Sequence, residues 1–470
     1  MNEPAEPTLQ QLLDRGAKLY AAGNSAAAAS VYRQALELDP HDPTVRLRHA
    51  IAIWHGEDRA EDALSEIRDL AKTFPQASVL AHEGLILNSL GRFAEAAVAS
   101  RRAVDADPNF SSAWLDLATA TAREDTAALA DELRGMLTKS PSQKVARDLN
   151  YALATVLRKT GDDDGAFEAC SAGNRLSLNR WQPQREGDLQ AMLREVFQPD
   201  LMARLQDTGN ADERMIFITG MPRSGTTLLD RLLSAHPVIH SVGETTTVGT
   251  LFNHLFSQTG KTAEGARAAL SGQVLKQMGA AYMNAIGQRI QGARAARIID
   301  KMPPNTMFWP LIALMFPKAT ILHTQRHPLG TCLSCWEASF AFGLDYATDM
   351  TTLGQAYRQY ADLTDHWGEV LGDRVQPVVY EQLVTDPETV VRTVLERVGL
   401  PFDARCLTPD ATGPIKTASV AQARAPIGTG SVDRWQAYTE RLAPVVEAMG
   451  GAAWLDARWE RIQDDRVGQS

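Results

Sequence analysis

The sequence has little cysteine, no excess of basic residues and no long apolar run. Four cysteines in 470 residues exclude a disulfide scaffold and are typical of a reducing cytosol. Asp and Glu number 57 against 47 Lys and Arg, a net charge of −10, which argues against a chain that coats nucleic acid or an anionic membrane. No apolar stretch approaches the roughly 20 residues of a membrane span, and residues 1–8 lack the features of a secretory signal. We therefore expect a cytoplasmic protein with no nucleic-acid partner and no membrane span.

A repeat of about 34 residues is the first positive feature. Prolines recur at positions 40, 75, 108 and 141, and two glycine pairs, Gly16 with Gly23 and Gly84 with Gly91, stand at matching offsets before them. This pattern predicts helical hairpins in which the first glycine of each pair lets two helices approach closely and the second forms the turn. An irregular Ala-rich helical bundle is the alternative.

The pattern resembles the tetratricopeptide repeat over residues 9–180, best in the units at 9–42 and 77–110. The resemblance implies an N-terminal α-solenoid whose concave face binds a protein partner. Residues 181–213 are predicted to be a linker with one helix, packed on the next domain. A chain of this length suggests two or three domains.

A strand, a glycine loop and a helix open the second part. Residues 215–219 form a short apolar run, residues 220–227 read Gly-Met-Pro-Arg-Ser-Gly-Thr-Thr, and leucines spaced for one helical face follow. Such a loop at a helix N-terminus is typical of a phosphate site. Thr226 stands where a P-loop nucleoside triphosphatase has its Lys, and the basic group is Arg223. This favours an anionic donor other than a nucleoside triphosphate, whereas a purely structural turn is the alternative.

Three further apolar runs, at 296–301, 319–326 and 375–381, are predicted to be strands separated by helices. Lys301 and Arg326 lie at the ends of two of them. Ligands of parallel α/β sheets bind at the carboxyl ends of the strands, so these side chains are expected at the same site as the loop.

Residues 214–470 resemble the sulfotransferases, in the branch that includes tyrosylprotein sulfotransferases and bacterial repeat-fused enzymes. The matching stretches are Pro-Arg-Ser-Gly-Thr-Thr at 222–227, Gly-Glu-Thr at 243–245, Asp-Lys-Met-Pro at 300–303, Arg-His-Pro at 326–328 with Ser334, Val-Tyr-Glu at 379–381, residues 419–426, and Arg434-Trp435. The resemblance implies a P-loop-like domain with a central parallel sheet flanked by helices. It also implies transfer of a sulfuryl group from 3′-phosphoadenosine 5′-phosphosulfate (PAPS) to a hydroxyl, with no metal ion.

The resemblance assigns catalytic roles to three residues. Glu244 matches the general base, which takes the proton of the attacking hydroxyl. Lys301 matches the group that stabilises charge on the leaving phosphate, and Ser419 matches a hydroxyl that assists there. A glutamate that only forms a salt bridge is the alternative for Glu244, and His236 and His240 are rival bases.

The resemblance assigns nucleotide binding to a larger set. The loop holds the 5′-phosphosulfate, Arg326 with Ser334 holds the 3′-phosphate, and three further residues lie near the nucleotide. These positions are Pro222, Arg223, Ser224, Gly225, Thr226, Thr227, Arg326, Ser334, Tyr380, Arg424 and Arg434. Cys332 and Cys335 have the spacing of half a zinc site, but helix packing explains them better.

Two departures from the family pattern bear on specificity. His327 replaces an Asp after the third strand's Arg, which affects the 3′-phosphate subsite. Residues 246–249 lack the arginines that suit acidic tyrosine peptides, so the acceptor is a protein, a peptide or a small molecule, with tyrosine as one possibility. The repeat fusion and the Ala-rich composition suggest a bacterial source. A P-loop kinase and a non-enzymatic repeat scaffold with a degenerate second domain are the competing hypotheses.

Overall fold

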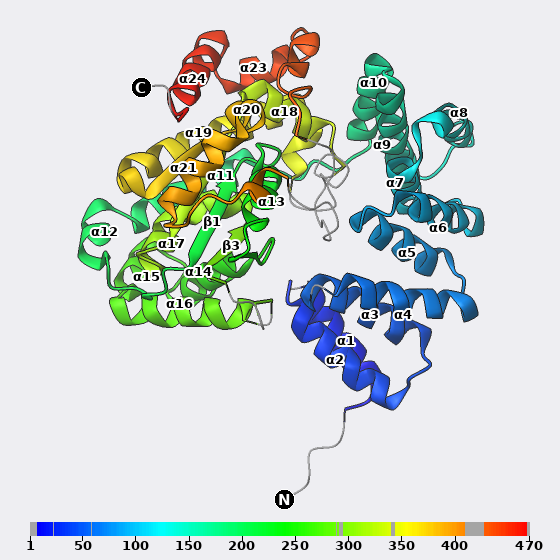
Figure 1. Cartoon of the computed structure of the whole chain (residues 1–470), viewed down its shortest axis with the longest axis horizontal. Coiled ribbons are helices and arrows are strands. Elements are labelled where there is room, and N and C mark those ends of the chain that lie inside the picture. The colour runs from blue at the N-terminus through cyan, green and yellow to red at the C-terminus, as the bar shows by residue number, and fades with distance from the viewer. Residues whose placement is uncertain are drawn as a thin grey trace, which may run out of the picture. The chain divides into compact units, whose positions relative to one another are not determined.

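The computed structural model describes residues 7–21, 23–57, 59–287, 289–290, 295–339, 344–408 and 427–467. They divide into two compact units, one reaching Ser177 and the other beginning at Leu178 (Figure 1). No helix among these residues is both long and apolar enough to cross a bilayer. The four cysteines are all buried, and two of them, Cys332 and Cys335, lie on one helix as expected.

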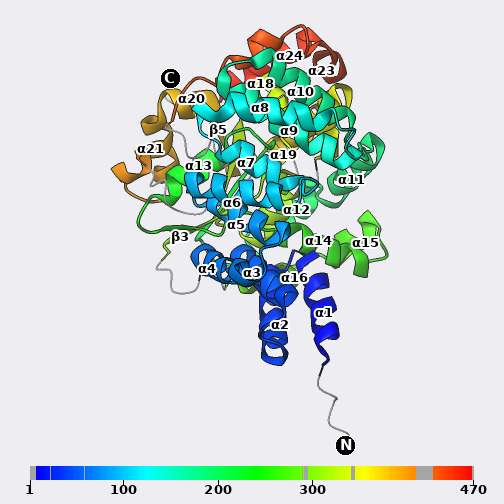
Figure 2. The ribbon, with the colours of Figure 1, turned by 90° about the vertical axis from the view of Figure 1, so that its right-hand side faces the viewer.

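The first unit is built from antiparallel helical hairpins that follow one another in chain order (Figure 2). Its elements are α1 (Leu9–Ala21), α2 (Ser25–Leu38), α3 (Pro43–Glu57), α4 (Ala60–Thr73), α5 (Ala77–Ser89), α6 (Phe93–Ala106), α7 (Ser112–Ala120), the 3₁₀ turn η1 (Arg123–Asp125), α8 (Thr126–Leu137), α9 (Gln143–Thr160) and α10 (Asp163–Arg175). The hairpins of the weaker second and fourth repeats are therefore present as well.

The repeat glycines occupy the positions that the sequence predicts for them. A Cβ atom on Gly16 would lie 2.4 Å from Cε1 of Tyr32, and one on Gly84 would lie 2.3 Å from Oγ of Ser100. Only a residue without a side chain allows these helix pairs to approach so closely. Gly23 has a φ of 79°, in the left-handed region that the turn between α1 and α2 requires.

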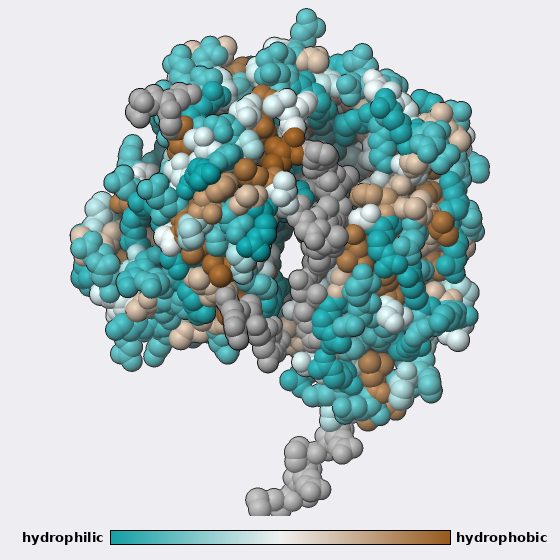
Figure 3. All heavy atoms as spheres, viewed as in Figure 1, coloured by the Kyte–Doolittle hydropathy of each residue, from teal (hydrophilic) through white to brown (hydrophobic). Residues whose placement is uncertain are grey.

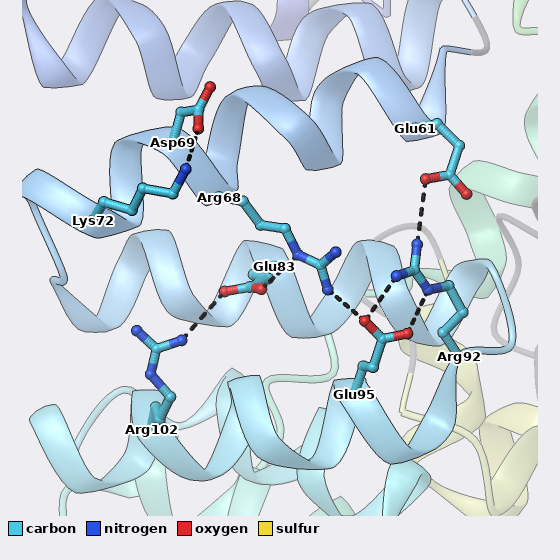
Figure 4. A network of polar contacts seen from close by, with 8 residues as sticks. All are labelled: Glu61, Arg68, Asp69, Lys72, Glu83, Arg92, Glu95 and Arg102. Carbon is cyan, nitrogen blue, oxygen red and sulfur yellow. Dashed lines mark hydrogen bonds and ion pairs between the residues drawn. The ribbon is translucent and has the colours of Figure 1, made fainter.

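An ion-pair network links the second and third hairpins (Figure 4). Glu83 of α5 is buried and contacts the guanidinium groups of Arg68 on α4 (3.0 Å) and Arg102 on α6 (3.7 Å). Arg68 also bonds Glu95, and hydrogen bonds from Arg92 and Arg68 lower the pKa of Glu95 to about 2. The carboxylates thus connect helices from consecutive repeats, where an α-solenoid needs its cohesion.

The second unit has a five-stranded parallel sheet in the order β2-β3-β1-β4-β5. The strands are β1 (Met215–Gly220), β2 (Ile239–Ser241), β3 (Arg297–Lys301), β4 (Thr320–Gln325) and β5 (Val375–Val379). The helices are α11 (Pro183–Val196), α12 (Pro199–Leu205), α13 (Thr226–Ser234), α14 (Thr247–Gln258), α15 (Ala263–Ala269), α16 (Gly272–Ile286), α17 (Trp309–Met315), α18 (Pro328–Trp336), α19 (Met350–Leu371), α20 (Tyr380–Thr385), α21 (Pro387–Arg397), α23 (Ala443–Met449) and α24 (Ala452–Asp464). Short 3₁₀ turns are η2 (Pro303–Phe308), η3 (Asp345–Thr348), η4 (Gly372–Arg374), η5 (Ala404–Leu407) and η6 (Arg434–Tyr438).

Helices cover both faces of this sheet. Successive residues of a strand point to opposite faces, so each strand contributes to two cores. Phe217 of β1 faces a core built mainly from α11, α12, α14 to α17 and α19. Its neighbours Ile216 and Ile218 face a smaller core shared with α13 and α21. The expected fold class, a helical array followed by a parallel sheet flanked by helices, is confirmed.

Two local predictions need correction. The stretch 181–213 contains two helices instead of one, and Leu193 of α11 and Leu201 of α12 are fully buried in the core of the second unit. The last strand ends at Val379, so Tyr380 is the first residue of α20 and not a strand residue.

Hydrophilic residues predominate on the exposed face in Figure 3.

Replacing Gly16 with Ala should destabilise the first hairpin by about 1–3 kcal/mol, because the new methyl group would collide with the buried Tyr32 ring. The matched control is Gly135→Ala on α8, where a Cβ meets nothing within 4 Å and should be neutral or slightly stabilising. Urea unfolding and hydrogen exchange of peptides covering α1 and α2 measure both. Equal exchange in the two variants would refute the close approach.

Candidate active site

The loop between β1 and α13 is shaped by two glycines. Gly220 has a φ of 154°, and a Cβ there would lie 2.5 Å from the carbonyl oxygen of Thr324 on β4. Gly225 has a φ of 107°, and a Cβ there would lie 2.7 Å from the ring of Tyr380. The loop therefore depends on both glycines, and α13 begins directly after it, with its unpaired backbone N–H groups at the loop.

Arg223 lies at the centre of this loop in a strained conformation. Its φ of 72° is in the left-handed region, which costs a non-glycine residue about 1–3 kcal/mol. Its Nε donates to Oγ of Ser334 on α18 at 3.0 Å. Burial lowers the pKa of Arg223 to about 10, so the side chain remains a cation at neutral pH. Strain of this kind concentrates at functional sites.

Arg326, directly after β4, converges on the same place. Its Nη1 donates to the carbonyl oxygen of Arg223 at 3.2 Å, and its Nη2 donates to that of Ser431 at 2.6 Å. The guanidinium lies 4.5 Å from the ring centre of Tyr380, whose hydroxyl is 2.7 Å from Oγ of Ser431. Arg223, Arg326, Ser334 and Tyr380 thus form one cluster.

His327, the departure from the family pattern, supports this cluster. Its ring stacks on Trp435 at 3.9 Å, and its Nδ1 accepts the N–H of Leu329 at the start of α18. Its own N–H donates to Glu381 at 3.0 Å. Burial lowers the pKa of His327 to about 4, so it is neutral at pH 7. A neutral ring therefore links the helix that carries Ser334 to the segment around Trp435.

Lys301 and Glu244 form an ion pair on the other side of β1. Lys301, the last residue of β3, is 2% exposed, whereas the Glu244 side chain is 43% exposed. The salt bridge anticipated as an alternative for Glu244 thus exists, but its partner is the other predicted catalytic residue. A buried ammonium needs such a partner, and the carboxylate reaches solvent where an acceptor could approach it.

The two rival bases are engaged elsewhere. Nε2 of His236 is 3.1 Å from the carbonyl oxygen of Pro401, and Nε2 of His240 is 2.8 Å from that of Arg289. These contacts hold one nitrogen of each ring against a backbone carbonyl.

Asp300 is a buried carboxyl beside Lys301. Its Oδ2 accepts hydrogen bonds from the hydroxyls of Tyr282 (2.6 Å) and Thr245 (3.1 Å), and its Oδ1 is buried without a hydrogen-bond partner. Burial raises its pKa to about 7, against smaller opposing effects of these hydroxyls and of nearby cations.

All five strands contribute to one edge of the sheet. Glu244 follows β2, Lys301 ends β3, the glycine loop follows β1, Arg326 follows β4 and Tyr380 follows β5. The chain crosses from one side of β1 to the other between β3 and β4, and open parallel sheets bind ligands at such a point. Glu244 and Lys301 therefore lie on one side of the glycine loop and Arg326 on the other. Arg223 lies in the loop itself.

The remaining predicted residues divide into three groups. Pro222, Ser224, Thr226 and Thr227 belong to the loop and the first turn of α13, and Ser224 is held by a 2.7 Å bond to Oγ1 of Thr324. Arg434 forms a two-pronged ion pair with Glu337, at the end of α18. Ser419 and Arg424 lie outside the described residues. Within the described ranges, no cluster of His, Cys, Asp and Glu could hold a metal ion.

Sequence reasoning missed Ser431, Asp300 and Thr245 as site residues. Ser431 contacts both Arg326 and Tyr380, yet nothing in its own neighbourhood marks it. Asp300 does carry a signal, because a carboxylate stands at the end of an otherwise apolar buried strand.

Comparison with known proteins supports this architecture. Residues 215–404 match the family model of the Sulfotransferase family, and residues 77–110 match that of the tetratricopeptide repeat. The chain carries a tetratricopeptide repeat and a sulfotransferase domain. The family match of the sulfotransferase domain covers β1 to β5, with the loop, Glu244, Lys301 and Arg326.

Relatives of this chain match different shares of it. An uncharacterised protein of Aquifex aeolicus is 29% identical over 86% of this chain. Protein-tyrosine sulfotransferase A of Caenorhabditis elegans is 30% identical over 43% of it. The chain spans about half the length of these curated relatives, 54% in each case. The sulfotransferase domain of the Synechococcus PCC 7002 olefin synthase aligns with 49% of this chain and 89% of its own, at 22% identity and a TM-score of 0.37.

The raised pKa of Asp300 predicts a pH dependence of stability. The unfolded carboxyl has a pKa near 3.8 and the folded one a pKa of about 7, so its contribution is fully present below pH 3.8 and is lost as the pH rises through 7. The stability of Asp300→Asn relative to the native protein should therefore increase between about pH 4 and pH 7. Urea unfolding over this pH range measures the difference, in which all other groups cancel. Parallel curves would contradict the raised pKa.

Proposed function

We propose that this chain is a sulfotransferase that moves a sulfuryl group from PAPS to a hydroxyl acceptor. The observation that carries the proposal is the convergence of Arg223, Arg326 and Ser334 beside the glycine loop, with Arg223 Nε 3.0 Å from Ser334 Oγ and Arg326 Nη1 3.2 Å from the Arg223 carbonyl. The Arg326 guanidinium is buried and the Arg223 side chain is half-buried, and two like charges in one cluster repel each other and favour a bound anion.

The residues present fit a nucleotide with two anionic ends. The loop from Pro222 to Thr227 and the N-terminus of α13 would hold the phosphosulfate, because glycines and helix N–H groups suit an anion. Arg326 and Ser334 would hold the 3′-phosphate, since a guanidinium can fork onto phosphate oxygens. Tyr380 and Arg434 would flank the nucleotide, and Arg424 stays a prediction from the sequence. When bound, PAPS supplies an activated sulfuryl group.

Glu244 and Lys301 would carry the chemistry. Glu244 would accept the proton of the acceptor hydroxyl, for which its partly exposed carboxylate is suitably placed. Lys301 would stabilise negative charge that develops on the leaving nucleotide. In the ion pair the ammonium occupies the carboxylate, so an anionic ligand that attracts Lys301 would also release Glu244 to act as base. Ser419 would assist Lys301.

The acceptor and the partner follow from the two parts of the chain. The tyrosine-sulfotransferase relatives support a phenolic hydroxyl as one acceptor class. The repeat array at 9–180 would recruit a protein on its concave face, the linker at 181–213 would join it to the domain at 214–470, and the enzyme would work in the cytoplasm of a bacterium.

Removing the Arg326 guanidinium should weaken nucleotide binding by at least about 1.5–3 kcal/mol, the contribution of a hydrogen bond to a charged group. The native protein should be stabilised in a thermal-shift assay by 3′-phosphoadenosine 5′-phosphate and not by ATP. Arg326→Ala should lose this shift, whereas Arg204→Ala, at an exposed position on α12, should keep it. Stabilisation by ATP instead would favour the kinase hypothesis.

Glu244→Gln should reduce transfer most for acceptors that hold their proton tightly, because a general base matters less for an acceptor that is already ionised. We expect transfer from labelled PAPS to phenol to fall about a hundredfold or more, and transfer to the more acidic p-nitrophenol to fall much less, with nucleotide binding unchanged. Equal losses with both phenols would show that the base lies elsewhere.

A further inference from the structure

Apart from its ion pair with Lys301, the Glu244 side chain does little to hold the turn in which it lies. Its backbone is fixed instead: Val242 N–H donates to the carbonyl of Ile299 on β3, and Lys301 N–H donates to that of Gly243. These two bonds hold residues 242 and 243, which precede Glu244. Other contacts hold the residues that follow it.

A buried chain of two hydroxyl groups and one carboxyl group holds the residue that follows Glu244. Thr245, the next residue after Glu244, is buried and donates through Oγ1 to Asp300 Oδ2 at 3.1 Å. The same oxygen accepts from Tyr282 of α16 at 2.6 Å. The Tyr282 ring is itself held between Phe217 and Phe316, at centroid distances of 5.8 and 5.3 Å. Asp300 therefore has little freedom, and neither does Thr245.

Arg289, three residues after the end of α16, also holds the turn. Arg289 Nη1 donates to the carbonyl oxygens of Val242 (2.7 Å) and Glu244 (3.2 Å), and the Arg289 carbonyl is 2.8 Å from His240 Nε2. The guanidinium thus bridges the residue two positions before Glu244 and Glu244 itself.

We propose that Tyr282 of α16, Asp300 of β3, Thr245 and Arg289 together brace the catalytic turn, as positioning residues for the Glu244 carboxylate. This inference rests on the proposed role of Glu244 as base. A carboxyl buried at the end of a parallel strand is costly unless its bonds do something that an apolar residue cannot. Here it fixes the backbone one residue from the carboxylate that must meet the acceptor, and small displacements of such groups are expensive for catalysis.

The test compares Thr245→Val, which removes the hydroxyl at nearly constant volume, with Thr245→Ser, which keeps it. In the full-length protein, Thr245→Val should speed hydrogen exchange of the amides at 242–247 by about fivefold to tenfold, and Thr245→Ser should leave it unchanged. Tyr282→Phe should give a smaller change of the same kind and serves if the valine variant folds poorly.

The kinetic arm uses transfer from labelled PAPS to phenol and to p-nitrophenol. Thr245→Val should lower kcat for phenol about tenfold and that for p-nitrophenol much less, with binding of 3′-phosphoadenosine 5′-phosphate intact and activity restored in Thr245→Ser. Equal losses with both acceptors, or unchanged exchange at 242–247, would overturn the brace. If Glu244→Gln shows no preference between the phenols, the base assignment fails, and the exchange arm alone still decides whether the brace exists.

Discussion

Burial of positive charge at one edge of a parallel sheet is the constraint on which the second unit depends. Lys301 and Arg326 are almost fully buried on either side of β1, and Arg223 lies in the loop that follows it. Burying such ions costs several kcal/mol each unless partners compensate for the lost hydration. Lys301 has Glu244, whereas Arg326 contacts two backbone carbonyls and the ring of Tyr380, which compensate only in part. An anion that completes this compensation is stabilised by charge already in place.

The strand order separates this charge into two places. Lys301 and Arg326 follow strands on opposite sides of β1, so their backbones are at least about 10 Å apart, two strand spacings. A ligand with anionic groups at two ends could pair with both. Glu244 is set apart as well, because it follows the edge strand β2 beyond Lys301 and is partly exposed.

Much of this arrangement is predictable because it depends on local patterns. Glycine spacing reveals the hairpins, and apolar runs that end in Lys301 and Arg326 reveal the strands and the edge where they meet. The missed features depend on pairings between distant positions: Ser431 reaches Arg326 from 105 residues away, and Tyr282 reaches Asp300 across a helix-to-strand connection. The second helix of 181–213 escaped detection because its seven residues are too few for a clear helical period.

Three residues of the candidate site conflict with their surroundings. Arg223 adopts a glycine-like backbone angle, Asp300 puts a carboxyl among apolar strand residues, and Lys301 buries an ammonium. The first unit combines both kinds of residue. Its buried Glu83 is paired with arginines, and Gly23 and Gly91 take positive backbone angles, but Ser140 also has a positive φ of 53° and burial lowers the pKa of Lys159 to about 8. Where local preference and the overall fold disagree, the folded protein loses stability. Such costs persist where they serve a function. In the second unit, Arg223, Asp300 and Lys301 lie in the glycine loop and at the carboxyl end of β3, next to each other in the strand order.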